Sequence, residues 1–251
     1  GISLYGVTFG NDTFVTVGES GYIIRSTDNG TNWDNVTSPT TNNLYGVIFG
    51  NDTLVGVGWS GNIVRSTDNA SSWDNATSNT SNLLYGVTFG NNTFVADGYS
   101  GNIVRSMDNG TNWDNATSPT GNLLAGVTFG NNTFVAVGGN IVRSTDNGSS
   151  WDNATSPTGN HLRGVTFGNN TFVAVGASGN ILRSTDNGSS WDNATSRTGN
   201  NLKGVTFGNN TFVAVGDNGT IVRSTDNGVS FGNVTSPTTN LLVGVVFGNN
   251  T

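Results

Sequence analysis

Short runs rich in β-forming hydrophobic residues alternate with clusters of Gly, Asn and Asp along the whole chain. In the first unit, four such runs cover residues 4–9, 13–17, 22–27 and 33–37. β-branched and aromatic residues favour strands, and the Gly/Asn/Asp/Pro clusters between the runs are typical of turns. The pattern therefore predicts an all-β protein built from short strands.

The four runs recur as a unit about every forty residues. Equivalent glycines mark the frame: Gly6, Gly46, Gly86, Gly126, Gly164, Gly204 and Gly244. The spacing is forty except from Gly126 to Gly164, where two residues are missing at Gly138-Gly139. A unit of this length with four strands has the size of one propeller blade.

The repeat predicts one domain over residues 1–251, a six-bladed β-propeller of four-stranded antiparallel blades. The repeats cover approximately 4–43, 44–83, 84–123, 124–161, 162–201 and 202–241, with a partial seventh at 242–251. The first strand thus occurs seven times, which leaves a surplus C-terminal strand.

The surplus strand allows three interpretations. It replaces its N-terminal counterpart and closes the ring, the array continues beyond Thr251, or the strand pairs with a neighbouring molecule. An unpaired strand edge is a template for another chain, so the third interpretation implies self-assembly through the terminal strand.

One motif, Ser-x-Asp-x-Gly-x-x-Trp, has a structural explanation in each unit. In the first copy, Asp28 is placed to accept backbone N–H bonds across a turn, Gly30 to adopt positive φ, and Trp33 to bury its ring between units. Two copies depart from the motif, with Ala70 for the glycine, and Phe231 with Gly232 for Trp-Asp. We expect these two units to be strained or more loosely packed.

These residues resemble the Asp-box (BNR) repeat of sialidase-like propellers. The longer pattern over residues 204–207, 213–216 and 219–226 is similar to the repeats of photosystem II assembly-factor propellers and of secreted repeat proteins. The resemblance covers essentially the whole chain and implies the propeller fold. It also implies that the Asp-box loop lies away from the catalytic face and serves folding.

Composition limits the function. The net charge is −7 with nine Lys plus Arg, which weighs against a nucleic-acid partner. No apolar run is long enough for a membrane helix, and the chain has no Cys. The first residue is Gly, which indicates a processed chain or a stretch of a longer one.

We predict that the protein is not an enzyme. The sialidase resemblance would require a tyrosine–glutamate pair, an arginine cluster and an acid/base aspartate, but Glu19 is the sole Glu. Six arginines occupy one repeated strand position, where we expect each to pair with a local aspartate: Arg25, Arg65, Arg105, Arg143, Arg183 and Arg223. His161 is the sole His, so the chain has no spare residues for a Ser/His/Asp catalytic triad. Asp97 is a solitary acid at a Val position, whereas glycosidase chemistry needs two carboxylates.

No cofactor or metal is predicted. Asp28, Asn32 and Asp34 lie at alternate positions as in a calcium loop, but Gly30 occupies a ligand position and Trp33 the position that requires Gly.

Two positions vary between the repeats while their surroundings stay fixed, one after the second strand and one at the start of the first. In a meander both lie on the same face of the ring. The variable residues predict an aromatic crescent on one side and basic residues on the other, as ligand-binding candidates: Tyr45, Trp59, Tyr85, Tyr99, His161, Arg163 and Lys203. Exposed aromatics suit carbohydrate or protein contacts. Neutral drift at tolerant loop tips is the alternative.

Asn-x-Ser/Thr sequons recur in three phases, at the first hairpin, at the Asp-box turn and at the start of the outer strand. We expect the first two sets to share the face opposite the aromatic crescent and the third to lie on the rim. The alternative is that Asn and Thr are turn and strand residues copied with the unit. The predicted glycosylation sites are Asn11, Asn29, Asn35, Asn51, Asn69, Asn75, Asn91, Asn109, Asn115, Asn131, Asn147, Asn153, Asn169, Asn187, Asn193, Asn209 and Asn233.

These observations together predict a non-catalytic, N-glycosylated scaffold that is extracellular or on the cell surface, a building block of a surface layer or filament. The alternative is a lectin-like propeller that binds carbohydrate or protein through the crescent.

Overall fold

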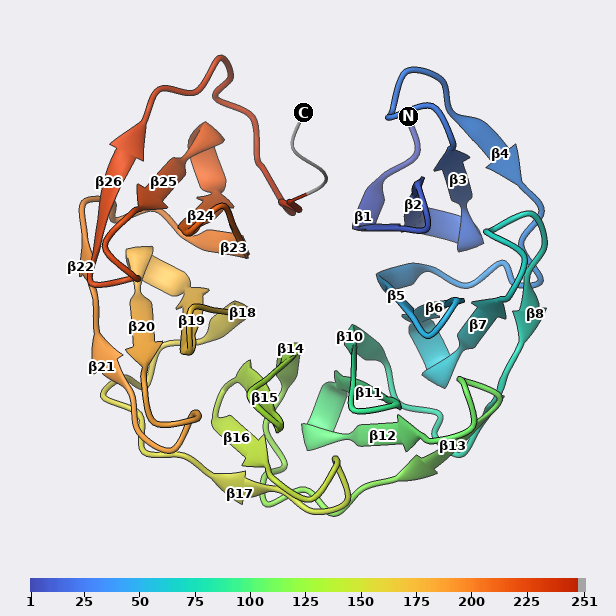
Figure 1. Ribbon diagram of the computed structural model, residues 1–251, viewed down its shortest axis with the longest axis horizontal. Coiled ribbons are helices and arrows are strands. Elements are labelled where there is room, and N and C mark those ends of the chain that lie inside the picture. The colour runs from blue at the N-terminus through green and yellow to red at the C-terminus, as the bar shows by residue number, and fades with distance from the viewer. Residues whose placement is uncertain (248–251) are drawn as a thin grey trace.

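The computed structural model describes residues 1–247 and consists of six sheets arranged around a centre (Figure 1). Each sheet is a meander whose first strand lies at the centre and whose last strand lies at the circumference. The prediction of six propeller blades is confirmed. No helix within residues 1–247 is long and apolar enough to span a bilayer.

Each blade is built from consecutive strands. The first three blades contain β1 (Leu4–Gly10), β2 (Thr13–Gly18), β3 (Ile23–Ser26) and β4 (Asp34–Val36); β5 (Leu44–Gly50), β6 (Thr53–Gly58), β7 (Ile63–Ser66) and β8 (Asp74–Asn75); and β10 (Leu84–Gly90), β11 (Thr93–Gly98), β12 (Ile103–Ser106) and β13 (Asn112–Asn115). The last three contain β14 (Leu124–Gly130), β15 (Thr133–Gly138), β16 (Ile141–Ser144) and β17 (Asp152–Asn153); β18 (Leu162–Gly168), β19 (Thr171–Gly176), β20 (Ile181–Ser184) and β21 (Asp192–Asn193); and β23 (Leu202–Gly208), β24 (Thr211–Gly216), β25 (Ile221–Ser224) and β26 (Ser230–Val234).

Two blades have a fifth strand that the sequence did not predict. β9 (Thr77–Ser78) pairs in parallel with β13, and β22 (Thr195–Ser196) pairs in parallel with β26. Both short strands come from the preceding repeat. The chain leaving one blade therefore runs along the outer edge of the next blade and covers it.

Short 3-10 turns connect the second and third strands of five blades: η1 (Glu19–Gly21), η2 (Trp59–Gly61), η3 (Tyr99–Gly101), η4 (Ala177–Gly179) and η5 (Asp217–Gly219). In the fourth blade, the two-residue deletion at Gly138-Gly139 shortens this connection.

The hydrophobic core lies between blades. At each joint, side chains from the second and third strands of one blade pack against strands of the next blade, together with its Asp-box tryptophan or phenylalanine. At the first joint, Val15, Val17 and Ile23 pack with Leu44 and Trp73. Because each blade buries its apolar surface only against its neighbours, the joint is the unit of stability.

The Asp-box turn has the predicted geometry. Asp28 Oδ1 accepts a 2.9 Å hydrogen bond from the backbone N–H of Asn32, and Gly30 has φ 82°. The same hydrogen-bonding pattern lowers the pKa of Asp68 to about 2, with the Ser72 hydroxyl as the largest cause. The Asp-box tryptophans are buried in four blades, but Trp33 is 41% exposed, so the prediction is wrong for the first unit.

The two atypical Asp boxes differ from each other. Ala70 adopts φ 61°, a left-handed conformation that strains a residue with a Cβ atom, so the expected strain is confirmed. Phe231, however, is buried in the joint between the fifth and sixth blades. The expectation of looser packing there is wrong, because the phenyl ring fills the site of the indole.

The arginines at the repeated strand position do not pair with aspartates, which corrects the prediction. Four of them instead donate to the backbone carbonyl oxygen of the Asp-box asparagine in the next blade: Arg25 to Asn69, Arg65 to Asn109, Arg105 to Asn147 and Arg183 to Asn227. The side chain reaches across the joint, where it links two blades.

The C-terminal segment does not replace β1, which pairs with β2 over its whole length. Residues 241–247 instead lie at the centre of the ring beside β23, between the sixth and first blades (Figure 1). The described part of this segment forms no strand, and residues 248–251 of the predicted partial repeat lie outside the described residues. Of the three interpretations of the surplus strand, replacement of β1 is therefore wrong.

Candidate binding face at the channel mouth

Three tyrosines from consecutive inner strands lie side by side at one end of the central channel. The ring centroids of Tyr5 and Tyr45 are 5.1 Å apart, and those of Tyr45 and Tyr85 are 5.5 Å apart. Each tyrosine is the second residue of its inner strand, so the forty-residue period itself stacks the rings. Tyr5 was not among the predicted site residues, although it occupies the same repeat position.

The tyrosines line a cavity of about 340 Å³ at this mouth. Arg163 and Lys203 line the same cavity, because they occupy the tyrosine position in the fifth and sixth blades. The full lining is Tyr5, Tyr45, Tyr85, Leu123, Ala125, Arg163, Lys203 and Val243. The mouth therefore has an aromatic arc and a basic arc.

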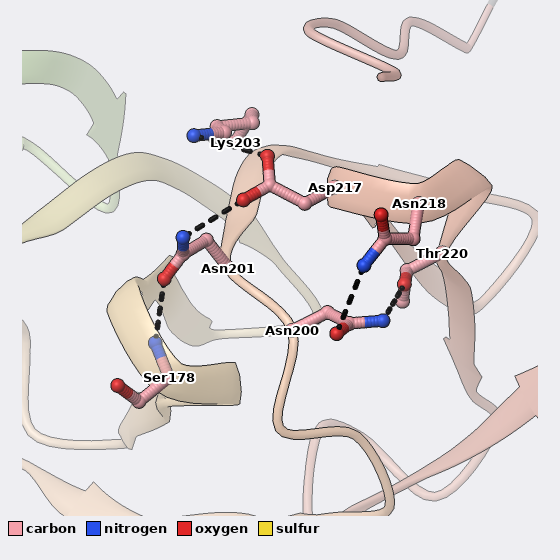
Figure 2. A network of polar contacts seen from close by, with 7 residues as sticks. All are labelled: Ser178, Asn200, Asn201, Lys203, Asp217, Asn218 and Thr220. Atoms are coloured by element: carbon pink, nitrogen blue, oxygen red, sulfur yellow. Dashed lines mark hydrogen bonds and ion pairs between the residues drawn. The ribbon is translucent and has the colours of Figure 1, made fainter. Parts of the chain in front are cut away.

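Lys203 is held by a polar network (Figure 2). Its Nζ lies 3.1 Å from Asp217 Oδ1, and Asn201 donates a 2.8 Å hydrogen bond to Asp217 Oδ2. Asn201 Oδ1 in turn accepts from the backbone N–H of Ser178 on η4, which connects the fifth and sixth blades. The Asn201 hydrogen bond and then Lys203 lower the pKa of Asp217, so this carboxylate offsets the Lys203 charge. Arg163 is exposed and has no ion-pair partner among residues 1–247.

A second, separate bond pair braces the same region. Asn200 donates a 2.8 Å hydrogen bond to Thr220 Oγ1, and Asn218 donates to Asn200 Oδ1 at 3.4 Å (Figure 2). These two bonds link the loop before β23 to η5 and to Thr220.

The remaining predicted site residues lie outside the cavity lining. Trp59 and Tyr99 are 52% and 57% exposed on η2 and η3, and Trp59 borders a separate shallow depression with Asn42 and Asn43. Tyr99 is close enough to Tyr85 to contribute to the raised pKa of Tyr85, whose main cause is burial. His161 is exposed near Gly139. Of the seven predicted residues, the structure brings Tyr45, Tyr85, Arg163 and Lys203 into one cavity.

Asp97 is fully buried between the third and fourth blades. Its Oδ1 accepts a 2.9 Å hydrogen bond from the backbone N–H of Gly86, while Oδ2 has no partner among residues 1–247. Burial raises its pKa to about 7. The carboxyl group does not line the cavity at the mouth.

The other end of the channel carries two of the sequon series. Asn51 in the first-strand hairpin of the second blade donates a 3.2 Å hydrogen bond to Asn109 in the Asp-box turn of the third blade. The hairpin and Asp-box turns therefore share one face, opposite the tyrosines, as expected. Within residues 1–247, no group of three His, Asp or Glu side chains is arranged to hold a metal ion.

Comparison with known proteins supports the same architecture. Residues 2–225 match the family model PSII_BNR, described as photosynthesis system II assembly factor YCF48. The fold is similar to a structure of "YCF48 bound to D1 peptide", at 18% identity over 92% of this chain and 80% of that chain, with a TM-score of 0.74. It is also similar to YCF48 from Cyanidioschyzon merolae, at 17% identity over 93% and 85% of the two chains, with a TM-score of 0.72.

The WD40 repeats of RRP9 superpose with a TM-score of 0.79 at 8% identity, over 98% of this chain and 84% of that chain. These identities establish the fold alone. No curated protein matches the sequence. With a family model that spans most of its length and six blades of the matching repeat, this chain belongs to the YCF48-like BNR-repeat family of β-propellers.

Proposed function

We propose that this protein is a non-catalytic propeller that binds an extended polypeptide segment at the channel mouth. The observation that carries the proposal is the cavity in which a tyrosine arc faces Arg163. Tyrosine and arginine are enriched among the few residues that contribute most of the binding energy in protein interfaces. Further support comes from the family description, which names an assembly factor, and from the related YCF48 structure described with a bound D1 peptide.

The ring geometry favours a peptide over a sugar in this cavity. A sugar stacks on a free aromatic face, whereas Tyr45 has a tyrosine ring on each side, tilted by 34° and 45°. Ring edges, hydroxyl groups and the exposed Arg163 guanidinium remain available. They suit a peptide with an acidic side chain that pairs with Arg163 and an apolar side chain that packs against the edges of the tyrosine rings.

The experiment screens an array of acidic, aromatic-containing peptides, with a glycan array in parallel. The test variant is Tyr45→Ala/Tyr85→Ala, and the fold accepts it because the fourth repeat has Ala125 at this position. The matched control is Trp59→Ala, since the fifth repeat has Ala177 there. Peptide binding that is lost in the double tyrosine variant and in Arg163→Ala, but kept in Trp59→Ala, is the expected result.

The opposite pattern favours the lectin-like alternative. Glycan binding that depends on the exposed Trp59 and Tyr99, and not on the tyrosine arc, would replace the peptide proposal. If no peptide binds the wild-type chain better than it binds the double tyrosine variant, the proposal fails.

A second proposal concerns the setting of this propeller, an extracellular or cell-surface glycoprotein scaffold. The supporting observation is that sequon asparagines at the hairpins and outer strands are exposed: Asn11, Asn51, Asn91, Asn131, Asn169 and Asn209; Asn35, Asn75, Asn115, Asn153, Asn193 and Asn233. Only 10% of the residues in the chain are charged, and glycans at these positions would hydrate its surface. The intact mass of native material before and after glycan removal tests it, and an unmodified mass contradicts it.

A further inference from the structure

The connection between the second and third strands is shorter in the fourth blade than in the other five. In the fifth blade, the sequence Gly-Ala-Ser-Gly at residues 176–179 makes this connection and contains η4. The fourth blade has only Gly138-Gly139 here, so it lacks counterparts of the middle two residues. The backbone N–H of Gly138 donates a 2.9 Å hydrogen bond to the carbonyl oxygen of Asn140, which closes a tighter turn.

In the other five blades, the last glycine of the 3-10 turn packs closely on a threonine of the loop that leaves the blade. A Cβ position built on Gly101 lies 1.9 Å from the carbonyl oxygen of Thr120, and the four remaining turns show the same approach at 1.8–2.0 Å. The equivalent threonine of the fourth blade is Thr158, and no turn glycine covers it. The Cβ position of Gly139 lies next to Asn122 and His161 instead. The two-residue deletion therefore uncovers this loop.

A cavity of about 270 Å³ lies beside the shortened turn. Every second residue from Ala154 to Asn160 lines it, on the loop that leaves the fourth blade. Its apolar part includes Ile141 and Leu162, each of which is only 2% exposed. None of the lining side chains is charged. The full lining is Gly138, Gly139, Asn140, Ile141, Ala154, Ser156, Thr158, Asn160 and Leu162.

The side chain of Asn160 is available to a ligand. Its repeat equivalents Asn122 and Asn200 donate hydrogen bonds to the following blade, at 2.6 Å to Asn140 Oδ1 and at 2.8 Å to Thr220 Oγ1. Within residues 1–247, Asn160 makes a hydrogen bond through its backbone N–H alone, to the side-chain hydroxyl two residues earlier at 3.1 Å. Its side-chain amide therefore keeps both donor and acceptor capacity at the cavity.

Asn140 and Thr158 supply two further donors. Asn140 Oδ1 accepts from Thr120 Oγ1 at 2.9 Å and from Asn122, while its Nδ2 group has no acceptor in the described part of the chain. The Thr158 hydroxyl accepts from Asn160 but donates to no acceptor among residues 1–247, whereas the equivalent Thr120 hydroxyl donates to Asn140. Amide and hydroxyl donors thus lie beside an apolar patch in one cavity.

We infer that this cavity binds one neutral sugar unit. A sugar ring presents hydroxyl groups that both donate and accept at its edge, which match the Asn140, Thr158 and Asn160 side chains, and C–H groups on its face, which match Ile141 and Leu162. A charged ligand would lose hydration without an ionic partner in the lining. The volume of about 270 Å³ is just below the lower limit of about 300 Å³ for drug-sized ligands, so it suits a single ring.

The sugar site is separate from the other candidate sites. It shares no lining residue with the cavity at the channel mouth, and the exposed Trp59 and Tyr99 line neither cavity. His161, the sole histidine, lies at its rim, with Cε1 3.5 Å from a Cβ position built on Gly139. Sugar binding here is therefore independent of peptide binding at the mouth, and each can fail without the other.

The test is an NMR titration of the ¹⁵N-labelled chain with glucose, galactose, mannose and N-acetylglucosamine, with glucuronate as the charged comparison. At least one neutral sugar should produce saturable chemical-shift changes at the backbone amide of Gly139 and at the side-chain amides of Asn140 and Asn160. A ligand of one ring should bind with a Kd on the order of 1 mM.

The matched variant inserts Ala-Ser between Gly138 and Gly139, which reproduces residues 176–179 of the fifth blade. The restored turn should cover Thr158 and weaken binding at least tenfold. Asn160→Ala removes no side-chain hydrogen bond within residues 1–247 and should weaken binding about threefold to tenfold. Trp59→Ala/Tyr99→Ala should bind the sugar as the wild type does.

Three results would overturn the sugar site. If no neutral sugar gives saturable changes at ten times the expected Kd, the cavity holds only water. Tighter binding of glucuronate than of the neutral sugars would contradict the ligand class. Binding that is unchanged in the insertion variant, or in Asn160→Ala should the insertion not fold, would place the sugar elsewhere, for example in the depression of about 320 Å³ beside η5.

Discussion

The indole Nε1 of Trp113 donates a 3.0 Å hydrogen bond to the carbonyl oxygen of Gly110. This bond closes the Asp-box turn of the third blade and fixes the tryptophan in the joint with the second blade. Trp33, Trp151 and Trp191 make the same bond to their own glycines. Buried Trp73 has Ala70 in the glycine position, and its Nε1 has no acceptor among residues 1–247.

Ala70→Gly is therefore expected to stabilise the protein by about 1 kcal/mol, because it relieves the left-handed strain and lets the Trp73 bond form. The reciprocal Gly110→Ala should destabilise by about 1–2 kcal/mol, since its Cβ atom would meet Val55 Cγ2 at 3.0 Å. Urea unfolding of the two variants measures both changes. Destabilisation by Ala70→Gly would show that the buried methyl group outweighs the strain.

Asp97→Val is expected to stabilise the protein in a pH-dependent way. The folded state holds the Asp97 proton with a pKa of about 7, against 3.8 when unperturbed, so the folded state binds more protons and stability declines as pH rises from about 4 to about 7. Above pH 7, the ionised Asp97 carboxylate therefore lowers the free energy of unfolding by on the order of 4 kcal/mol. Valine removes this cost and matches the residue in equivalent positions such as Val57.

The measurement is the difference in unfolding free energy between wild type and Asp97→Val at pH 4.5 and pH 8. The difference should be several-fold larger at pH 8. Asp68 and Asp146, with pKa values lowered to about 2, contribute stability that is lost below pH 4 in both proteins, so they cancel in the comparison. Asp97→Asn, which keeps an acceptor for the Gly86 N–H, should be insensitive to pH in this range. Equal differences at both pH values would contradict the raised pKa.

Trp113→Ala and Trp33→Ala form a matched pair that measures what a joint contributes. Trp113 is fully buried, so its truncation should lower the free energy of unfolding by about 3–5 kcal/mol. Trp33 is 41% exposed, and its truncation should lower the free energy of unfolding by about 1–2 kcal/mol, because much of its ring is already in water. Thermal or urea unfolding measures both losses, and equal losses would mean that Trp33 is as buried in solution as Trp113.

Glycan occupancy, if the chain is modified, should differ between the sequon series. Asn109 and Asn147 donate through Nδ2 to Thr53 and Thr93 at 2.6 Å, so a glycan on Nδ2 would break a contact between blades. Asn11 and Asn35 are exposed. Site-resolved glycopeptide mass spectrometry should find the hairpin and outer-strand series occupied and the Asp-box series sparsely occupied. Full occupancy of Asn109 in folded protein would contradict this order.

Much of the fold follows from the chain's local pattern. The forty-residue period, the strand runs and the Asp-box turn depend on contacts within a few residues, such as Asp28 with Asn32 or Gly30 with Trp33, so they are readable from one repeat. The same regularity predicted that Tyr45, Tyr85, Arg163 and Lys203 share one end of the ring. Repetition alone placed them, because each occupies the same position in its unit.

The tertiary structure decided everything that depends on how one blade meets the next. Arg25 donates to the carbonyl oxygen of Asn69 in the next blade in place of a nearby aspartate. Trp33 is part of the local Asp-box motif, yet its side chain is exposed. The physical reason is that a repeat specifies the shape of a blade, whereas the angle between blades and the number that surround the axis arise from side-chain packing at the joints. Local sequence thus fixes the surfaces of a blade, and packing fixes which of them find a partner.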